Sequence, residues 1–184
     1  MNIRVSLLAV VGVIQLAVPG WMIFQQEQTL RFGTEYKFLT EPVDPYDIFR
    51  GRFVALRFKT EEMKQKPGES ELPRGAKVYV AVKTNTDGFA EVERVSSNPL
   101  AGDNVFPATV RWGNNLEFPF SRYYMEETRA PQAEQAYRSA NTRNSKQKTW
   151  AVVRIWHGNA ALADLMIDGQ PIRDYLRDHP QPKK

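Results

Sequence analysis

The feature that most constrains this chain is an apolar run from Val5 to Phe24, VSLLAVVGVIQLAVPGWMIF. A helix of about 20 apolar residues is long enough to cross the hydrocarbon core of a bilayer. Gln15 is the one strongly polar side chain in the run, and Trp21 stands where an interfacial aromatic residue is expected. The sequence therefore predicts a transmembrane helix over residues 1–25, followed by a separate body.

A cleaved signal peptide is the alternative for the same segment. Arg4 fits a basic amino-terminal region, but the apolar run is long for a signal peptide, and Ala17 to Pro19 makes a poor cleavage site. These features favour an uncleaved signal anchor. Arg4 precedes the run, whereas residues 25–29 carry one acid and no base, so we expect a cytoplasmic amino terminus. The body is then expected on the periplasmic or extracytoplasmic side of the cytoplasmic membrane.

The composition limits what the body can be. Hydrophobic residues make up 42% of the chain, which is enough for a core. The net charge of +4 is too small and too dispersed for a nucleic-acid footprint, which needs clustered Lys and Arg. The chain has no cysteine, which excludes disulfides, thiolate metal ligands and cysteine nucleophiles. We expect one exported domain over residues 26–178 and a polar tail over residues 179–184.

Short alternating segments predict strands in this body. They are residues 30–39, 52–60, 76–84, 89–95, 105–112, 116–120, 149–156 and 160–167. One helix is expected after Thr128 as N-cap, with Pro131 in its first turn and small residues at helical spacing. Residues 171–177 fit a short terminal helix. The predicted fold is α+β: a mostly antiparallel sheet of about seven or eight strands with one packed helix.

The stretch from Thr40 to Lys59, TEPVDPYDIFRGRFVALRFK, joins a turn to a strand. Pro42 and Pro45 favour turn or extended geometry for the residues before them. Asp44 and Asp47 are residue types that bond nearby backbone N–H groups in turns. The residues alone therefore predict a strand after an acidic, proline-rich turn.

This stretch also resembles the GDYXXLXY family, bacterial membrane-anchored proteins named for that motif. The family pattern runs roughly E/A-P-V-D-P-x-D-x-x-R-G-D-Y-V-x-L-x-Y. Positions that agree with it are Pro42, Val43, Asp44, Pro45, Asp47, Arg50, Gly51, Val54 and Leu56. Arg52 replaces the motif aspartate, and Phe53 and Phe58 replace its two tyrosines. The resemblance covers about residues 30–172 and implies an architecture rather than an established activity.

The candidate functional motif is the set Asp44, Asp47, Arg50, Gly51, Arg52, Phe53, Leu56 and Phe58. The acids of the turn, together with Glu41, stand close to Arg50 in the sequence. Such carboxylates can bind a cation or do acid–base work when their pKa values are driven apart. The alternative, which we favour, is that they bond backbone N–H groups of the turn.

No metal or cofactor is expected from the sequence. It has no Gly-rich phosphate loop, no H-E-x-x-H and no G-x-S-x-G. The histidines are His157, in an expected turn, and His179, in the tail. Without cysteine, a transition-metal site would need both histidines plus carboxylates.

Five aromatic residues form a possible ligand platform: Trp112, Tyr123, Tyr124, Trp150 and Trp156. The alternative is that most of them pack in the core, because antiparallel sheets bury one face. An exposed subset would mark a contact with a protein or a glycan.

Two functions from different classes follow. The first is a non-enzymatic binding or accessory module, tethered to the membrane, for another membrane protein. Proteins that resemble this one are often encoded beside a polytopic membrane protein, so the resemblance implies such a partner. The second is a hydrolase acting on an envelope polymer, with Asp44 or Asp47 paired to Glu126. It requires these carboxylates to converge within about 10 Å, although Glu126 also suits the start of a helix, where the dipole favours an acid.

Overall fold

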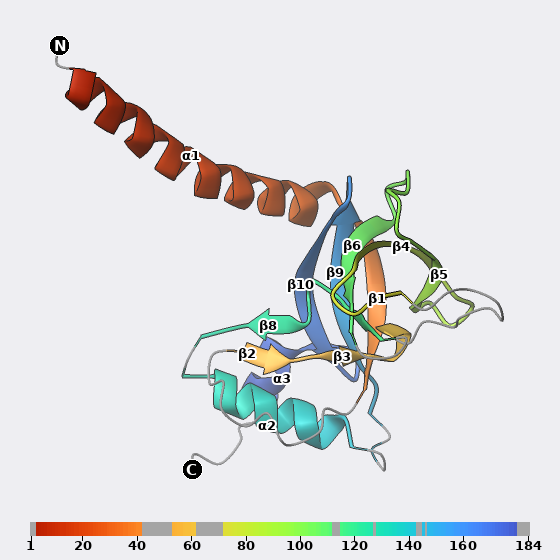
Figure 1. The fold of residues 1–184 in the computed structure, drawn as a ribbon. Coiled ribbons are helices and arrows are strands. Elements are labelled where there is room, and N and C mark those ends of the chain that lie inside the picture. Colours follow the sequence, from red (N-terminus) through yellow and green to blue (C-terminus); the bar gives the residue numbers. More distant parts are fainter. Residues whose placement is uncertain are drawn as a thin grey trace.

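A computed structural model describes residues 3–41, 53–61, 72–111, 115–126, 128–142, 145 and 147–179. A long helix leads into a β-rich body, and two shorter helices lie together at the far end of that body (Figure 1). In order, the elements are α1 Ile3–Phe32, β1 Thr34–Glu41, β2 Phe53–Ala55, β3 Arg57–Phe58, the 3-10 turn η1 Lys59–Glu61, β4 Lys77–Thr84, β5 Ala90–Ser96, β6 Val105–Val110, β7 Leu116–Glu117, β8 Arg122–Tyr124, α2 Ala130–Ala140, β9 Thr149–Trp156, β10 Asn159–Ile167, β11 Gln170–Pro171 and α3 Ile172–Asp178.

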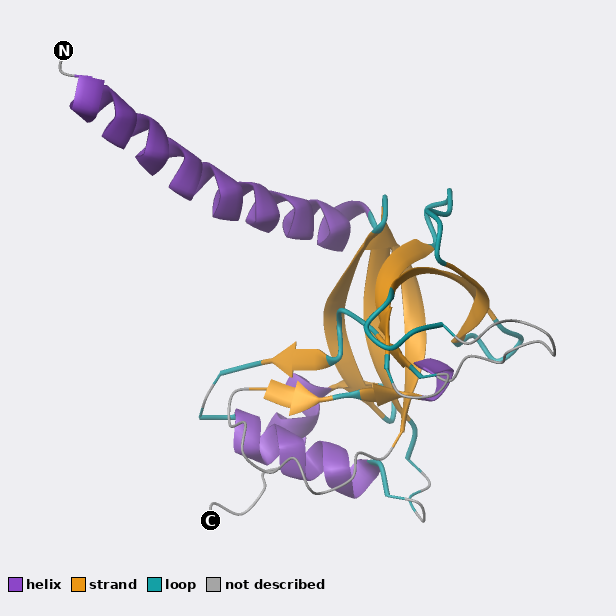
Figure 2. Ribbon diagram, viewed as in Figure 1, coloured by secondary structure: helices purple, strands orange, loops and turns teal. Residues whose placement is uncertain are grey.

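Within the described residues the strands form three sheets rather than one. Their orders are β11-β10-β9-β1-β3, β5-β4-β6-β7 and β2-β8, and every pairing is antiparallel. The larger two curve around each other, with α2 and α3 at one end and α1 joining the other (Figure 2). The predicted α+β class and the antiparallel pairing are confirmed. The single sheet of seven or eight strands is wrong, because short strands leave one sheet and join another.

The core is centred on five buried phenylalanines from strands and loops distant in sequence. Phe38 of β1 lies 5.0 Å from Phe120 and 5.8 Å from Phe58, measured between ring centroids. Phe106 and Phe118 complete the group, and all five are at most 3% exposed. Aromatic rings at such separations add to the stability that their burial provides. The five rings thus join the two larger sheets to the end of the motif.

Strand β9 shows the alternating burial that its sequence predicts. Thr149, Ala151, Val153 and Ile155 are buried, whereas the residues between them are partly exposed. Successive side chains of a strand point to opposite faces, so one face of β9 forms core. The strands predicted over residues 76–84 and 89–95 pair antiparallel as β4 and β5, and those predicted over residues 149–156 and 160–167 pair antiparallel as β9 and β10.

Helix α2 buries the alanine face predicted for it, and Tyr137 on that face is 2% exposed. Its N-cap is Arg129 instead of the predicted Thr128, and no side chain caps the helix there. Pro131 lies in the first turn, as predicted. The short terminal helix predicted over residues 171–177 is confirmed as α3. It packs against α2, so the described body has a second packed helix beside the one counted in the predicted fold.

Helix α1 extends past the predicted boundary at residue 25 and ends at Phe32. The predicted strand start at Leu30 is therefore wrong. Backbone bonding remains helical there, since Gly33 N donates to Thr29 O at 2.9 Å. Thr29 is fully buried, and the end of α1 packs on β9 and β10. This packing outweighs the strand-like composition of residues 30–32.

The first two-thirds of α1 project from the body (Figure 1). No helix in the described ranges combines the length and apolar character that a membrane span requires. Many large apolar side chains of α1 are nevertheless exposed at successive positions. They are Leu7, Leu8, Val10, Val11, Val13, Ile14, Leu16, Val18, Trp21, Met22, Ile23 and Phe24.

Candidate binding site beside the motif strand

The described part of the motif is divided between two sheets. Strand β2 pairs with β8, which places Phe53 opposite Tyr124. At Leu56 the backbone N–H donates to Ser121 O at 2.9 Å, and the chain then continues as β3 against β1. The predicted single strand over residues 52–60 is therefore wrong, because the motif crosses from one sheet to another.

Alternation along this segment assigns different roles to the motif residues. Val54, Leu56 and Phe58 are buried, at 1%, 6% and 1% exposure. Phe58 lies among the core phenylalanines, an environment that suits a ring without a hydroxyl. Phe53 points to the other face and is half-buried. Asp44, Asp47, Arg50, Gly51 and Arg52 lie outside the described residues, so the turn itself is not described.

Phe53 belongs to a surface cluster that we call the aromatic shelf, formed by Phe53, Arg122 and Tyr124. The two ring centroids are 5.7 Å apart, and the Arg122 guanidinium lies 5.2 Å from the Phe53 centroid. A guanidinium at that distance is attracted to the face of the ring. Of the described residues after α1, Tyr124 is the only large hydrophobic residue that is exposed, at 64%. The shelf therefore presents aromatic surface next to the motif strand.

A surface hollow of about 470 Å³ adjoins the shelf. Arg122 and Tyr124 form part of its wall, together with outward-facing residues of β4, β6 and β7. Thr109 pairs with Lys77 on one side and with Glu117 on the other, so these three side chains share one face of the sheet. This volume is in the range of small-ligand sites.

The charge of the hollow is mainly positive. Arg111 donates two hydrogen bonds to the Glu117 carboxylate, at 3.1 and 2.8 Å. These bonds lower the pKa of Glu117, so the carboxylate is ionised and already neutralised by its partner. Within the described ranges, neither Lys77 nor Arg122 has a carboxylate within ion-pair distance. The lining thus carries two cations, Lys77 and Arg122, against the one carboxylate of Glu117, whose pKa Arg122 also lowers.

The buried side of β8 carries a second polar arrangement. The Tyr123 hydroxyl donates a hydrogen bond of 3.0 Å to Asp164 Oδ1. The same oxygen accepts the Leu165 N–H at 2.8 Å, next to an irregularity in the β9–β10 register. Burial, followed by the negative charge of Asp164, raises the pKa of Tyr123 to about 12. The positive charge of Arg173 acts in the opposite direction and lowers this pKa. At neutral pH Tyr123 is a proton donor, which suits a structural link better than a catalytic base.

Sequence reasoning missed this arrangement. Asp164 is a single acid in the apolar segment ALADLMI of β10, and that contrast is the signal that a buried partner exists. The identity of the partner is not visible in the sequence, because Tyr123 lies 41 residues away.

Glu126 lies at the surface before α2. Its carboxylate is 3.6 Å from the Arg129 guanidinium, and its side chain is 71% exposed. This location matches the predicted alternative, an acid close to the start of a helix. The carboxylate pair of the hydrolase hypothesis stays a prediction, because Asp44 and Asp47 lie outside the described residues.

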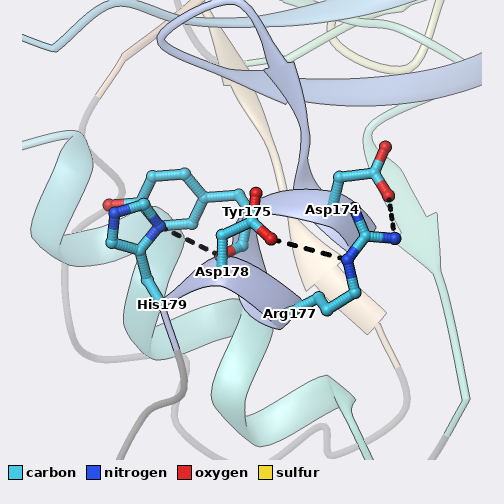
Figure 3. Close-up of polar contacts among 5 residues, drawn as sticks. All are labelled: Asp174, Tyr175, Arg177, Asp178 and His179. Carbon is cyan, nitrogen blue, oxygen red and sulfur yellow. Dashed lines mark hydrogen bonds and ion pairs between the residues drawn. The ribbon is translucent and has the colours of Figure 1, made fainter.

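The two histidines lie at opposite ends of β10, a nine-residue strand that spans about 30 Å. His157 is in the β9–β10 turn with a positive φ of 45°. His179 follows α3, where its ring stacks on Tyr175 and its Nδ1 lies 3.2 Å from Tyr175 O (Figure 3). Asp174 and Asp178 of α3 both contact Arg177 (Figure 3). Because His157 and His179 lie at opposite ends of β10, their imidazoles cannot share one metal ion.

The five-residue aromatic platform does not form in the described structure. Tyr123 is buried, whereas Tyr124 is exposed in the aromatic shelf. Trp150 packs at 6.0 Å from Phe89, and Trp156 at 6.2 Å from Phe32, between ring centroids. Trp112 lies outside the described residues. Among the four that the structure describes, Tyr124 is the exposed one, and Phe53 of the motif joins it.

These observations define a class of protein: a helix-led α+β protein with an aromatic surface on its motif strand. Residues 15–165 match the family described as GDYXXLXY protein. The chain belongs to the GDYXXLXY family, and the match extends from α1 into β10. No curated protein and no solved structure matches the chain.

Proposed function

We propose that this protein is a membrane-anchored binding module of the bacterial envelope, which contacts another membrane protein through the aromatic shelf. The observation that carries this proposal is the exposed Tyr124 ring, packed against Phe53 of the motif strand. Exposed aromatic and arginine side chains are the residue types that most often dominate protein interfaces. The shelf combines both types.

The anchor in this proposal is the apolar segment of α1. From Val5 to Phe24 its sequence has one strongly polar side chain, Gln15. Successive residues such as Leu7 and Leu8 are exposed at 67% and 77%, so apolar surface is present on more than one side of the helix. A helix that is apolar all round needs an apolar environment, and a bilayer supplies one. Uncleaved insertion as a signal anchor accounts for that exposure.

Arg4 before this segment and the absence of Lys and Arg from residues 25–29 support a cytoplasmic amino terminus. The body then lies on the periplasmic or extracytoplasmic side. Because the end of α1 packs on β9 and β10, the anchor would hold the body in a fixed orientation instead of on a loose linker. The resemblance that points to a polytopic membrane protein as the partner is consistent with such a fixed position.

The experiment is a cross-linked pull-down of the full-length protein from intact membranes. The wild type is compared with Phe53→Ala, Asp44→Ala and Arg50→Ala, and with Phe89→Ala as an aromatic control away from the shelf. Resistance of every variant to alkaline extraction establishes the anchor. Recovery of one polytopic protein by the wild type and by Phe89→Ala, but not by Phe53→Ala, supports the proposal. Release of the wild type by alkaline extraction contradicts the anchor, and equal recovery by all variants contradicts the contact surface.

A further inference from the structure

We propose that the hollow beside β8 binds an extended, acidic segment of the partner protein. This inference rests on the proposed function and names the chemistry of the partner. The first ground is charge: Lys77 and Arg122 both line the hollow, while Glu117 is held by Arg111. A ligand with carboxylates therefore complements the charge of the site.

The second ground is the spacing of the side chains on β8. Arg122 and Tyr124 are exposed and Tyr123 is buried. The side chains of Arg122 and Tyr124 therefore point outward on the same face of β8. Residues two apart on a strand are separated by about 6.5 to 7 Å. An extended peptide presents its own side chains at that same repeat on one face. If an acidic residue of the peptide lies opposite Arg122, the residue two positions further along the peptide lies opposite Tyr124.

The third ground is the apolar part of the lining. Pro107 and Pro119 are exposed at the hollow, and Tyr124 adds an aromatic face. Prolines and a tyrosine offer contact to aliphatic or aromatic side chains, which a free phosphate lacks. The combination of two cations with this apolar surface selects a peptide in which acidic and apolar residues alternate on one face.

The test uses the full-length protein in detergent micelles and a fluorescein-labelled peptide of sequence TETVTETV. The matched peptide TQTVTQTV replaces each Glu by Gln. Fluorescence anisotropy gives the Kd of each peptide for the wild type, Lys77→Glu and Arg122→Glu. Two charge-matched controls are Lys83→Glu, at the other end of β4, and Arg94→Glu on β5, both exposed positions. Circular dichroism confirms that each variant is folded.

We expect saturable binding of the Glu peptide that weakens at least tenfold in Lys77→Glu and Arg122→Glu. The two control variants should bind within twofold of the wild type, and the Gln peptide should bind at least tenfold more weakly. Equal affinity for the Glu and Gln peptides overturns the acidic assignment. No saturable binding of the Glu peptide overturns the proposal, and saturable binding of a fluorescein-labelled oligouronate in its place assigns the hollow to an anionic glycan.

The failure of this inference differs from the failure of the proposed function. If Phe53→Ala loses the membrane partner while Lys77→Glu, which changes the hollow and not the shelf, retains it, the shelf is the contact and the hollow is not. That result overturns the acidic-segment assignment and leaves the binding module intact.

Discussion

Tyr123 and Asp164 join two parts of the fold through one hydrogen bond of 3.0 Å. Tyr123 lies on β8, the strand that pairs with the motif strand β2, and Asp164 lies in the irregular part of β10. The bond therefore attaches the two-stranded ribbon to the larger sheet. Because the aromatic shelf lies on the opposite face of this ribbon, the bond also holds the shelf in place.

Replacement of Tyr123 by Phe should lower the free energy of unfolding by about 1–2 kcal/mol. The change keeps the ring but leaves Asp164 with one donor fewer, and hydrogen bonds to charged groups are among the stronger ones. Urea unfolding of the protein in detergent micelles measures the effect. Tyr124→Phe is the matched control at the neighbouring exposed position and should lie within about 0.5 kcal/mol of the wild type. Equal effects of the two changes would contradict the link.

The stability of the protein should decrease in alkali because of Tyr123. The unfolded chain releases this proton near pH 10.0, and the folded chain retains it until about pH 12. Between these values the unfolded state binds fewer protons, so the stabilising contribution is complete below pH 10 and is lost as the pH rises to 12. The loss should reach about 2–3 kcal/mol. Tyr123→Phe should show a correspondingly shallower decline over the same range, and parallel curves would contradict this assignment.

Gly33→Ala should destabilise the junction between α1 and the body. A Cβ at Gly33 would lie 2.5 Å from Thr29 O and 3.0 Å from Arg154 Cβ, so backbone has to move. Overpacking of this kind costs about 1–3 kcal/mol. Hydrogen exchange of the first residues of β1 should accelerate. Gly20→Ala, where nothing lies within 4 Å, should leave that exchange unchanged. Slow exchange in both variants would show that the junction tolerates the methyl group.

Phe38→Ala should destabilise the body by about 3–5 kcal/mol, the usual cost of removing a buried phenylalanine ring. Phe38 is fully buried and contacts all four other core phenylalanines. The control is Phe32→Ala, since Phe32 is 57% exposed. Thermal unfolding should show a large decrease in Tm for the first variant and a small one for the second. A small decrease for Phe38→Ala would place the core elsewhere.

The sequence predicted the elements whose signal is local. Strands β4 and β9 were found because apolar residues alternate along their sequences. Strands β5 and β10 were found because each follows turn residues and brings the chain back. Strand β8 was missed because it has three residues, too few for a period to appear. The boundary of α1 was misplaced because tertiary packing of Thr29 keeps residues 30–32 helical in spite of their composition.

The candidate site was predicted only in part. The family motif drew attention to Phe53, which the structure places in the aromatic shelf. It did not separate Phe53 from Leu56 and Phe58, which are buried in the core. That separation depends on the chain changing sheets at Leu56, through a bond to Ser121 that lies 65 residues further on. The hollow was not predicted, since it is assembled from four strands and loops between them.

The measurement that tests the account most directly is site-specific photo-cross-linking in intact membranes. A photoreactive phenylalanine analogue replaces Tyr124 in the shelf or, as the control, the partly buried Tyr36 of β1. We expect the probe at position 124 to form one discrete adduct with a polytopic membrane protein, and the probe at position 36 to form none. Adducts of the same pattern from both positions, or none from position 124 in a stably inserted protein, would contradict the assignment of the shelf as the contact surface.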